Sequence, residues 1–234
     1  MSNAKRSMLT FAAALLLPQV AVAQANDESS RKIAGGGISV AGWMGKIDDK
    51  EVAAGQVLSN AKLAGDAKKM TVTTGPAVTY WNPANKATGD YTIKATFNEP
   101  QFMNVNSHAH PYGLVIGGSD LGSDNQSYLY CAAYGDGRFI VRGMGPAPFQ
   151  MNGRGEANPA INKAAGKLSP VTQEIAMSVK GDKVSCAING TVVGTYDKAA
   201  VVGAGKLKST DGVYGLRFGH NTDATVTGLT MTKP

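Results

Sequence analysis

The chain has 234 residues, of which 43% are hydrophobic and 17% charged, a globular composition that allows one domain or two small ones. Its formal net charge is +6 without a run of Lys or Arg, so nothing favours nucleic-acid binding, and only a weak attraction to anionic surfaces or polysaccharides is expected. The 29 glycines and the near absence of stretches rich in Leu, Glu and Lys favour short strands joined by tight turns.

The first 25 residues have the layout of a secretory signal peptide. Lys5 and Arg6 form a positive start, the stretch 8–23 is almost wholly apolar, and small residues around Ala23 offer two cleavage points. A membrane anchor is the alternative, but proline and glutamine interrupt the apolar run that such an anchor needs. We therefore expect a periplasmic or secreted protein with no membrane span after cleavage, and a flexible leader over residues 26–42.

From residue 43 onward the sequence is a succession of short segments with alternating polarity. Turn signals such as Gly181-Asp182 and Asn189-Gly190 separate them and predict antiparallel hairpins, because these residues tolerate positive φ. The stretch 46–69 is expected to form loops with one or two short strands, and 143–166 a long loop. Many short strands at this spacing predict an all-β sandwich or barrel. The expected strands are 70–74, 91–97, 112–116, 128–134, 138–142, 174–180, 183–188, 191–196, 213–218 and 224–232.

The order of three consecutive pieces resembles one known superfamily. A strand ending in Gly117-Gly118 precedes the tyrosine-rich strand 128–134, a hairpin with Asn189-Gly190 follows, and Gly-Val-Tyr-Gly-Leu-Arg over 212–217 closes the set. This order resembles the concanavalin A-like lectin/glucanase superfamily, above all its laminin-G-like modules and 3-keto-disaccharide hydrolase-type domains. The resemblance implies an all-β fold, a two-sheet antiparallel jelly-roll sandwich over residues 43–234, with a concave face that holds a glycan or substrate. A fold alone does not transfer a function.

The acidic residues that the glucanases of this superfamily use are missing. Those enzymes carry Glu-x-Asp-x-x-Glu on one strand, so that one carboxylic acid protonates the leaving oxygen while a carboxylate about 5–5.5 Å away attacks. This sequence contains no Glu-x-Asp at all, and it has neither a Gly-x-Ser-x-Gly motif nor a phosphate-binding loop. We therefore assign no catalytic residue and expect no retaining glucanase activity by that route. A pair of carboxylates distant in sequence, such as Glu99 with Asp120, is the alternative that stays open.

Aromatic, guanidinium and amide side chains are the best ligand candidates. Along the strand 128–134, three tyrosines share one face, while Leu129, Cys131 and Ala133 share the other. Aromatic rings pack against the C–H face of a sugar, and guanidinium or amide groups bind its hydroxyls. The alternative is a structural role, since tyrosines are common strand residues. The candidate ligand-binding set is Trp81, Tyr112, Tyr128, Tyr130, Tyr134, Arg138, Arg142, Arg217 and Asn221.

The three histidines of the chain are candidate metal ligands. His108 and His110 lie on one side of an extended backbone and, together with His220, would make a three-histidine site with an open position, as catalytic zinc requires. The alternative is that His108 and His110 lie on a polar loop and face water.

A second candidate metal site would take calcium, and the two cysteines would form one disulfide. Asp120, Asp124 and Asn125 lie in a loop rich in Gly and Ser, where oxygen ligands can hold calcium, although such residues are also ordinary in turns. Cys131 and Cys186 allow one intramolecular bond, which export would preserve, or else they are two small buried side chains.

The leading hypothesis is an exported domain that binds carbohydrate or an envelope glycan without catalysis. A glycoside hydrolase, metal-assisted through the three histidines, is the first alternative, and a protein-interaction module of the laminin-G-like kind is the second. No cofactor is assigned, apart from the calcium that the acidic loop would hold.

Overall fold

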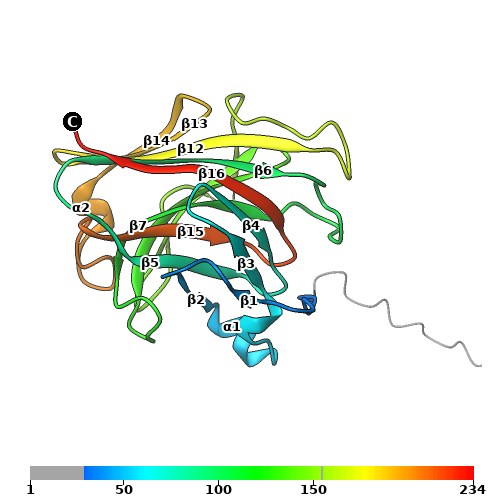
Figure 1. Ribbon diagram of the computed structural model, residues 1–234. Helices are drawn as coiled ribbons and strands as arrows, with labels where there is room; N and C mark the ends of the chain where they lie inside the picture. Colours follow the sequence, from blue (N-terminus) through cyan, green and yellow to red (C-terminus); the bar gives the residue numbers. More distant parts are fainter. Residues whose placement is uncertain (1–28, 154) are drawn as a thin grey trace, which may run out of the picture.

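The computed structural model describes residues 29–153 and 155–234, which form two large sheets packed face to face (Figure 1). Sheet A has the strand order β1 (Gly37–Ile38), β3 (Lys62–Gly65), β4 (Lys69–Thr73), β16 (Asp223–Thr232), β6 (Tyr91–Glu99), β12 (Val171–Lys180), β13 (Lys183–Ile188) and β14 (Thr191–Asp197). Sheet B has the order β10 (Phe149–Gln150), β9 (Arg138–Met144), β8 (Ser127–Tyr134), β7 (Pro111–Ser119), β15 (Gly212–Phe218), β5 (Val78–Ala87) and β2 (Met44–Ile47), and β11 (Glu156–Ala157) also pairs with β9.

Antiparallel pairing dominates both sheets, and the predicted all-β sandwich is confirmed. Only β1 and β3 pair in parallel among the described strands. The turn between β13 and β14 has φ of 51° at Asn189 and 80° at Gly190, as expected for a hairpin in which both central residues have positive φ. The helical segments are short: α1 (Asp49–Ala53), the 3₁₀ turn η1 (Leu58–Asn60) and α2 (Lys198–Val201). Within residues 29–153 and 155–234, no helix combines the length and apolar character that a membrane crossing requires.

The core lies between the sheets and is built from the inward-facing residues of alternating strands. In β6, for example, Tyr91, Ile93 and Phe97 are each at most 2% exposed and belong to the core cluster. Cys131 on β8 and Cys186 on β13 form a disulfide with a Cα–Cα distance of 6.2 Å, so the predicted bond exists and links sheet B to sheet A.

The segment expected to be a leader belongs to the domain from Ser29 onward. Gly37–Ile38 pairs with β3, Val40 is 5% exposed in the core, and Arg31 forms an ion pair with Asp223 at 2.6 Å. A Cβ built on Gly36 would lie 2.1 Å from the carbonyl oxygen of Ser59, so this glycine allows a close approach of two backbones. The expectation of flexibility over 26–42 is therefore wrong for its described part, and the domain begins before residue 43. The signal peptide, residues 1–25, lies outside the described residues.

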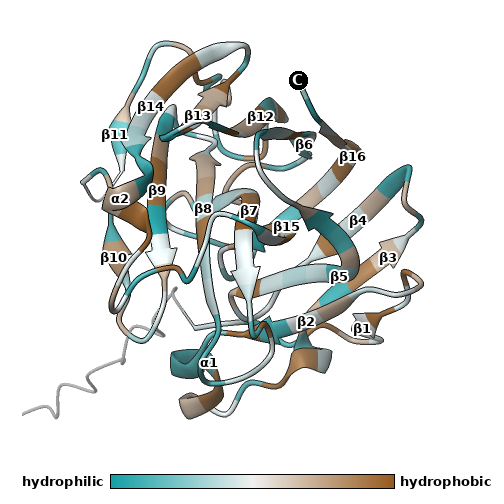
Figure 2. Ribbon diagram, turned by 90° about the vertical axis from the view of Figure 1, so that its left-hand side faces the viewer, coloured by the Kyte–Doolittle hydropathy of each residue, from teal (hydrophilic) through white to brown (hydrophobic). Residues whose placement is uncertain are grey.

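The two irregular stretches contain more structure than expected. The stretch 46–69 holds α1 and η1 as well as strand residues, and the predicted long loop 143–166 contains β10 and β11, which both pair with β9. β10 and β11 extend sheet B at the edge where β9 lies beside β8 (Figure 2).

Candidate functional site

Most of the predicted ligand-binding residues gather on the outer face of sheet B. The register places Tyr130 opposite Arg142 on β9 and opposite Val115 on β7. Val115 pairs with Gly215 on β15, which in turn pairs with Trp81 on β5, so one row of residues crosses five strands. The other outward residues fall in neighbouring rows. The predicted members on this face are Trp81, Tyr128, Tyr130, Tyr134, Arg138, Arg142 and Arg217.

Two predicted ligand-binding residues lie elsewhere. Tyr112 is 0% exposed and faces the core between the sheets, where its ring stacks on Phe97 with centroids 5.8 Å apart. Asn221 is 6% exposed and accepts a hydrogen bond from the backbone N–H of Arg31 while donating one to the carbonyl of Ser29. Their assignment to the ligand face was wrong: Tyr112 is a core residue, and Asn221 fastens the N-terminal segment.

The centre of this face is covered by the protein's own loop. Trp81, Tyr128 and Tyr130 are 3%, 0% and 5% exposed. The loop after β7 lies over them: Leu121 packs against the cluster that contains both tyrosines, and a Cβ built on Gly122 would lie 3.4 Å from the Trp81 ring. Lys46 from β2 donates to the carbonyl of Ser123 at 2.8 Å and so fastens the same loop. These central aromatic rings therefore form a second, smaller core.

A buried ion pair lies beneath this cover. Arg217 donates to both carboxylate oxygens of Asp48, at 2.6 and 2.5 Å, and also to Thr79 at 3.2 Å. Burial alone would raise the pKa of Asp48 and lower that of Arg217, but their mutual attraction reverses both shifts, so the pKa of Asp48 is lowered and that of Arg217 raised. Both groups therefore stay charged, and Arg217 is a structural residue rather than a free hydroxyl-binding group.

The accessible part of the face is a strip made of Tyr134, Arg138 and Arg142, which are all partly exposed. The Arg138 guanidinium lies 4.8 Å from the centroid of the Tyr134 ring and is held by Asp136 at 2.7 Å. Arg142 is placed beside Tyr130 by the register, and its buried Nε has no hydrogen-bond partner in the described part of the chain. This strip offers an aromatic ring and two guanidinium groups to solvent.

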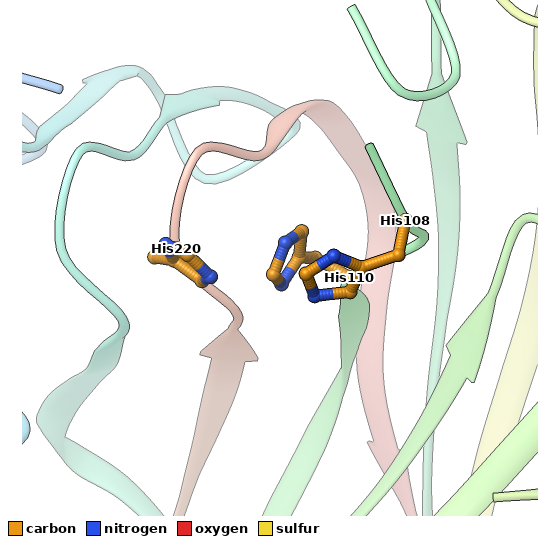
Figure 3. Close-up of side chains that lie close together, drawn as sticks. All are labelled: His108, His110 and His220. Carbon is orange, nitrogen blue, oxygen red and sulfur yellow. The ribbon is translucent and has the colours of Figure 1, made fainter. Parts of the chain in front are cut away.

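The three histidines come together at the end of sheet B, as the sequence analysis proposed. His108 and His110 precede β7 and His220 follows β15; their rings cluster with His110 between the other two (Figure 3). The centroids of His108 and His110 are 4.4 Å apart and those of His110 and His220 4.0 Å, and one ring nitrogen of each lies within 4.8 Å of the others. Burial, with repulsion from His220, His108 and Lys50, lowers the pKa of His110 to about 3, so its imidazole is neutral at physiological pH.

In the predicted calcium loop, both aspartate carboxylates form ion pairs with lysine side chains. Lys208 forms an ion pair with Asp120, and Lys46 lies 3.2 Å from Asp124, whose side chain is fully exposed. Lys208 also lines a cleft of about 680 Å³ together with Asp120 and Asn125. Calcium takes six to eight oxygen ligands, and these lysines compete with it for the carboxylates. The arrangement favours the ordinary turn interpretation of this loop.

Sequence reasoning did not identify a second aromatic pocket. Trp43 and Tyr214, both partly exposed, line a pocket of about 350 Å³ together with Asn82, Asn85 and Asp66. The two rings come from segments far apart in the chain, so no sequence spacing links them. The one available signal was a pair of asparagines three residues apart after Trp81.

Comparison with known proteins shows the fold and not a family. No family model matches the chain, and no curated protein matches it. A GH16 protein of mixed-linkage glucan utilisation from Bacteroides ovatus, in complex with a product, is 10% identical, with a TM-score of 0.53 over 81% of this chain and 94% of its own. An endo-β-1,3-glucanase from Pyrococcus furiosus (10% identity, 82% and 89% covered, TM-score 0.48) and the carbohydrate-binding module CBM66 from Bacillus subtilis (12%, 85% and 99%, 0.43) are also similar. The chain has the concanavalin A-like lectin/glucanase jelly-roll fold.

Proposed function

We propose that this chain is an exported, non-catalytic carbohydrate-binding domain that recognises an envelope or extracellular glycan with the strip Tyr134, Arg138 and Arg142. The observation that carries the proposal is that tyrosine rings of β8 and arginine side chains of β9 lie side by side on one face, with Tyr134, Arg138 and Arg142 partly exposed. The structural neighbour with a TM-score of 0.53 holds a product in the same type of sandwich, which supports a sugar as the ligand class.

The chemistry of the strip suits a sugar with hydroxyl or carboxylate groups. A tyrosine ring packs against the apolar C–H face of a pyranose, while a guanidinium fork donates two parallel hydrogen bonds to neighbouring oxygens. Asp136 holds Arg138 in place, so little side-chain entropy is lost when a ligand binds there. The absence of Glu-x-Asp from the whole sequence supports binding without glucanase catalysis.

The test is a glycan-array screen of the exported, processed protein, followed by titration of the best glycan. Tyr134→Ala and Arg142→Ala should each weaken binding about tenfold, which corresponds to about 1.4 kcal/mol. Tyr214→Ala, in the separate pocket with Trp43, is the matched control and should bind like the parent. A blank array with folded protein rejects the function. A loss confined to Tyr214→Ala keeps the function and moves the site to that pocket.

The same array also tests the acidic loop. Screening with calcium and then with a chelator should give the same binding, because Lys208 and Lys46 already neutralise Asp120 and Asp124. Binding that disappears with the chelator and returns with calcium would instead assign a calcium site to this loop.

A further inference from the structure

Every histidine of this chain belongs to one cluster. The sequence holds three, and all of them meet at the end of sheet B, although His110 and His220 are 110 positions apart. Histidines that serve only as solvent-exposed loop residues have no reason to converge from two segments. Imidazole is the commonest side-chain ligand of transition metals. Catalytic zinc sites have three protein ligands and one open coordination position, and three imidazoles are one such ligand set.

The central ring of the cluster has a nitrogen that needs a partner. Nε2 of His110 is buried and has no hydrogen-bond partner among the described residues. A buried polar atom is rarely left without a partner, because its lost hydration is then not replaced by another interaction. A metal ion bound between the three rings would provide that partner.

The outer ring His220 is oriented by a chain of polar groups. Glu51 on α1 is 6% exposed and accepts a hydrogen bond from Ser30 Oγ at 2.6 Å, and Ser30 Oγ lies 3.4 Å from Nδ1 of His220. Since the serine proton goes to the carboxylate, its oxygen is left to accept a hydrogen bond from the Nδ1–H of His220. That tautomer leaves Nε2 of His220 as the ligand atom, and such outer partners are typical of metal-binding histidines.

The same groups border a pocket. It has a volume of about 320 Å³ and is lined by His220, Ser30 and Glu51, together with Lys50 and Gln56. Of the three histidines, His220 lines this pocket, which lies beside α1, below sheet B in Figure 1. The pocket therefore borders the cluster on its His220 side.

We infer that His108, His110 and His220 bind one divalent transition-metal ion of the zinc class and leave one coordination position open. Zn–N bonds of about 2.0–2.1 Å in a tetrahedral site place the ligand nitrogens about 3.4 Å apart. The three nitrogens lie within 4.8 Å of one another, so no pair has to approach by more than about 1.4 Å. Imidazole ligands favour zinc, cobalt, nickel or copper over calcium or magnesium. This site is independent of the proposed glycan strip.

The first experiment is a titration of the full chain, without a histidine tag, with Co²⁺ and with Zn²⁺. We expect one ion per chain, and an intense visible absorption from four-coordinate Co²⁺ that Zn²⁺ abolishes. His108→Ala and His220→Gln should weaken binding at least a hundredfold; His108 is exposed, so its removal leaves the fold intact. Asp124→Asn, which changes an exposed carboxylate outside the histidine cluster, is the control for adventitious binding and should behave like the parent. No saturable binding, or equal binding by parent and His108→Ala, overturns the inference.

A second variant tests whether the hydrogen bonds around His220 orient its ring for metal binding. Ser30→Ala removes the link between His220 and Glu51 and should weaken metal binding about tenfold while leaving the stoichiometry at one. Its visible Co²⁺ spectrum should shift, because the His220 ring loses its fixed orientation. An unchanged affinity and spectrum would contradict the orienting role of Ser30.

Discussion

The outer faces of the two sheets differ in what covers them. On sheet A, β6 and β12 alternate between buried and accessible residues along their whole length, as expected for a sheet with one solvated side. On sheet B, β7 is buried over seven consecutive residues and β8 likewise. The loop after β7 lies over the outer face of sheet B, so these strands are covered on both sides, whereas the outer face of sheet A is accessible.

The residues on the two faces differ accordingly. The outer face of sheet A carries short polar pairs, such as Thr92 with Ser178 at 2.8 Å and Lys94 with Glu174 at 3.2 Å. The outer face of sheet B carries large rings and the buried pair Arg217–Asp48. Buried charges lose much when one partner is removed, whereas exposed pairs contribute little. The comparison therefore predicts that sensitivity to mutation, as well as ligand binding, is concentrated on the outer face of sheet B.

The largest expected effect comes from breaking the ion pair on sheet B. Arg217→Met keeps much of the side-chain volume but leaves the Asp48 carboxylate buried without its partner, and should lower the free energy of unfolding by about 3 kcal/mol. Urea denaturation at neutral pH measures this loss. Adding Asp48→Asn to Arg217→Met should restore part of the stability, because the buried charge is then gone.

The control is Arg142→Met, a partly exposed arginine on the same face that forms no ion pair in the described part of the chain and acts on Asp48 only through a weaker, longer-range attraction. It should change the unfolding free energy by less than about 0.5 kcal/mol. Equal losses for Arg217→Met and Arg142→Met would show that the buried ion pair with Asp48 does not set Arg217 apart from another arginine of the same face.

The comparison also explains how much of this structure the sequence could predict. The alternating pattern of β8 correctly placed Tyr128 and Tyr130 on one face of the strand and Leu129 and Cys131 on the other, because neighbouring residues of a strand point to opposite faces. It could not orient Tyr112, because β7 is apolar on both faces and has no alternating pattern. Period-two patterns therefore predict the fold of sheet A and the strands of sheet B, but not which face of a doubly covered strand carries the ligand.

Contacts between distant segments were beyond sequence reasoning. Arg217 and Asp48 are 169 residues apart, and no local pattern indicates that the strand β15 and the start of α1 meet. The glycines of the N-terminal segment suggested flexibility, whereas Gly36 permits close backbone packing instead. The spacing of His108 and His110 predicted that their rings share one side of the backbone, but no local pattern places His220, 110 positions after His110, beside them.

Glu99, a buried acid on the inner side of sheet A, should make the unfolding free energy depend on pH. Burial, opposed by a hydrogen bond from the Met103 backbone and aided by Asp223 and Asp136, raises the pKa of Glu99 to about 7. A carboxyl whose folded pKa is raised stabilises the fold fully below its unfolded pKa of about 4.5, and this contribution is lost as the pH rises through 7. The unfolding free energy of Glu99→Gln relative to the parent should therefore be about 3 kcal/mol greater at pH 8 than at pH 4.5.

Chemical denaturation of both proteins across this pH range tests the prediction. Glu174→Gln, an exposed glutamate of the same sheet, serves as the control, and its difference from the parent should stay within about 0.5 kcal/mol at every pH. If Glu99→Gln and the parent follow parallel pH profiles, Glu99 is ionised in the folded protein and its burial is compensated by water.

The smallest expected effect lies on the outer face of sheet A. Thr92 and Ser178 face each other across β6 and β12, and their hydroxyl groups are 2.8 Å apart on a partly exposed surface. Because water replaces the lost hydrogen bond when either hydroxyl is removed, Thr92→Val and Ser178→Ala should each change the unfolding free energy by about 0.5 kcal/mol. A double-mutant cycle should give a coupling of about the same size. A coupling above about 1.5 kcal/mol would mean that this face is shielded from water, as the outer face of sheet B is, and would remove the contrast between the two sheets.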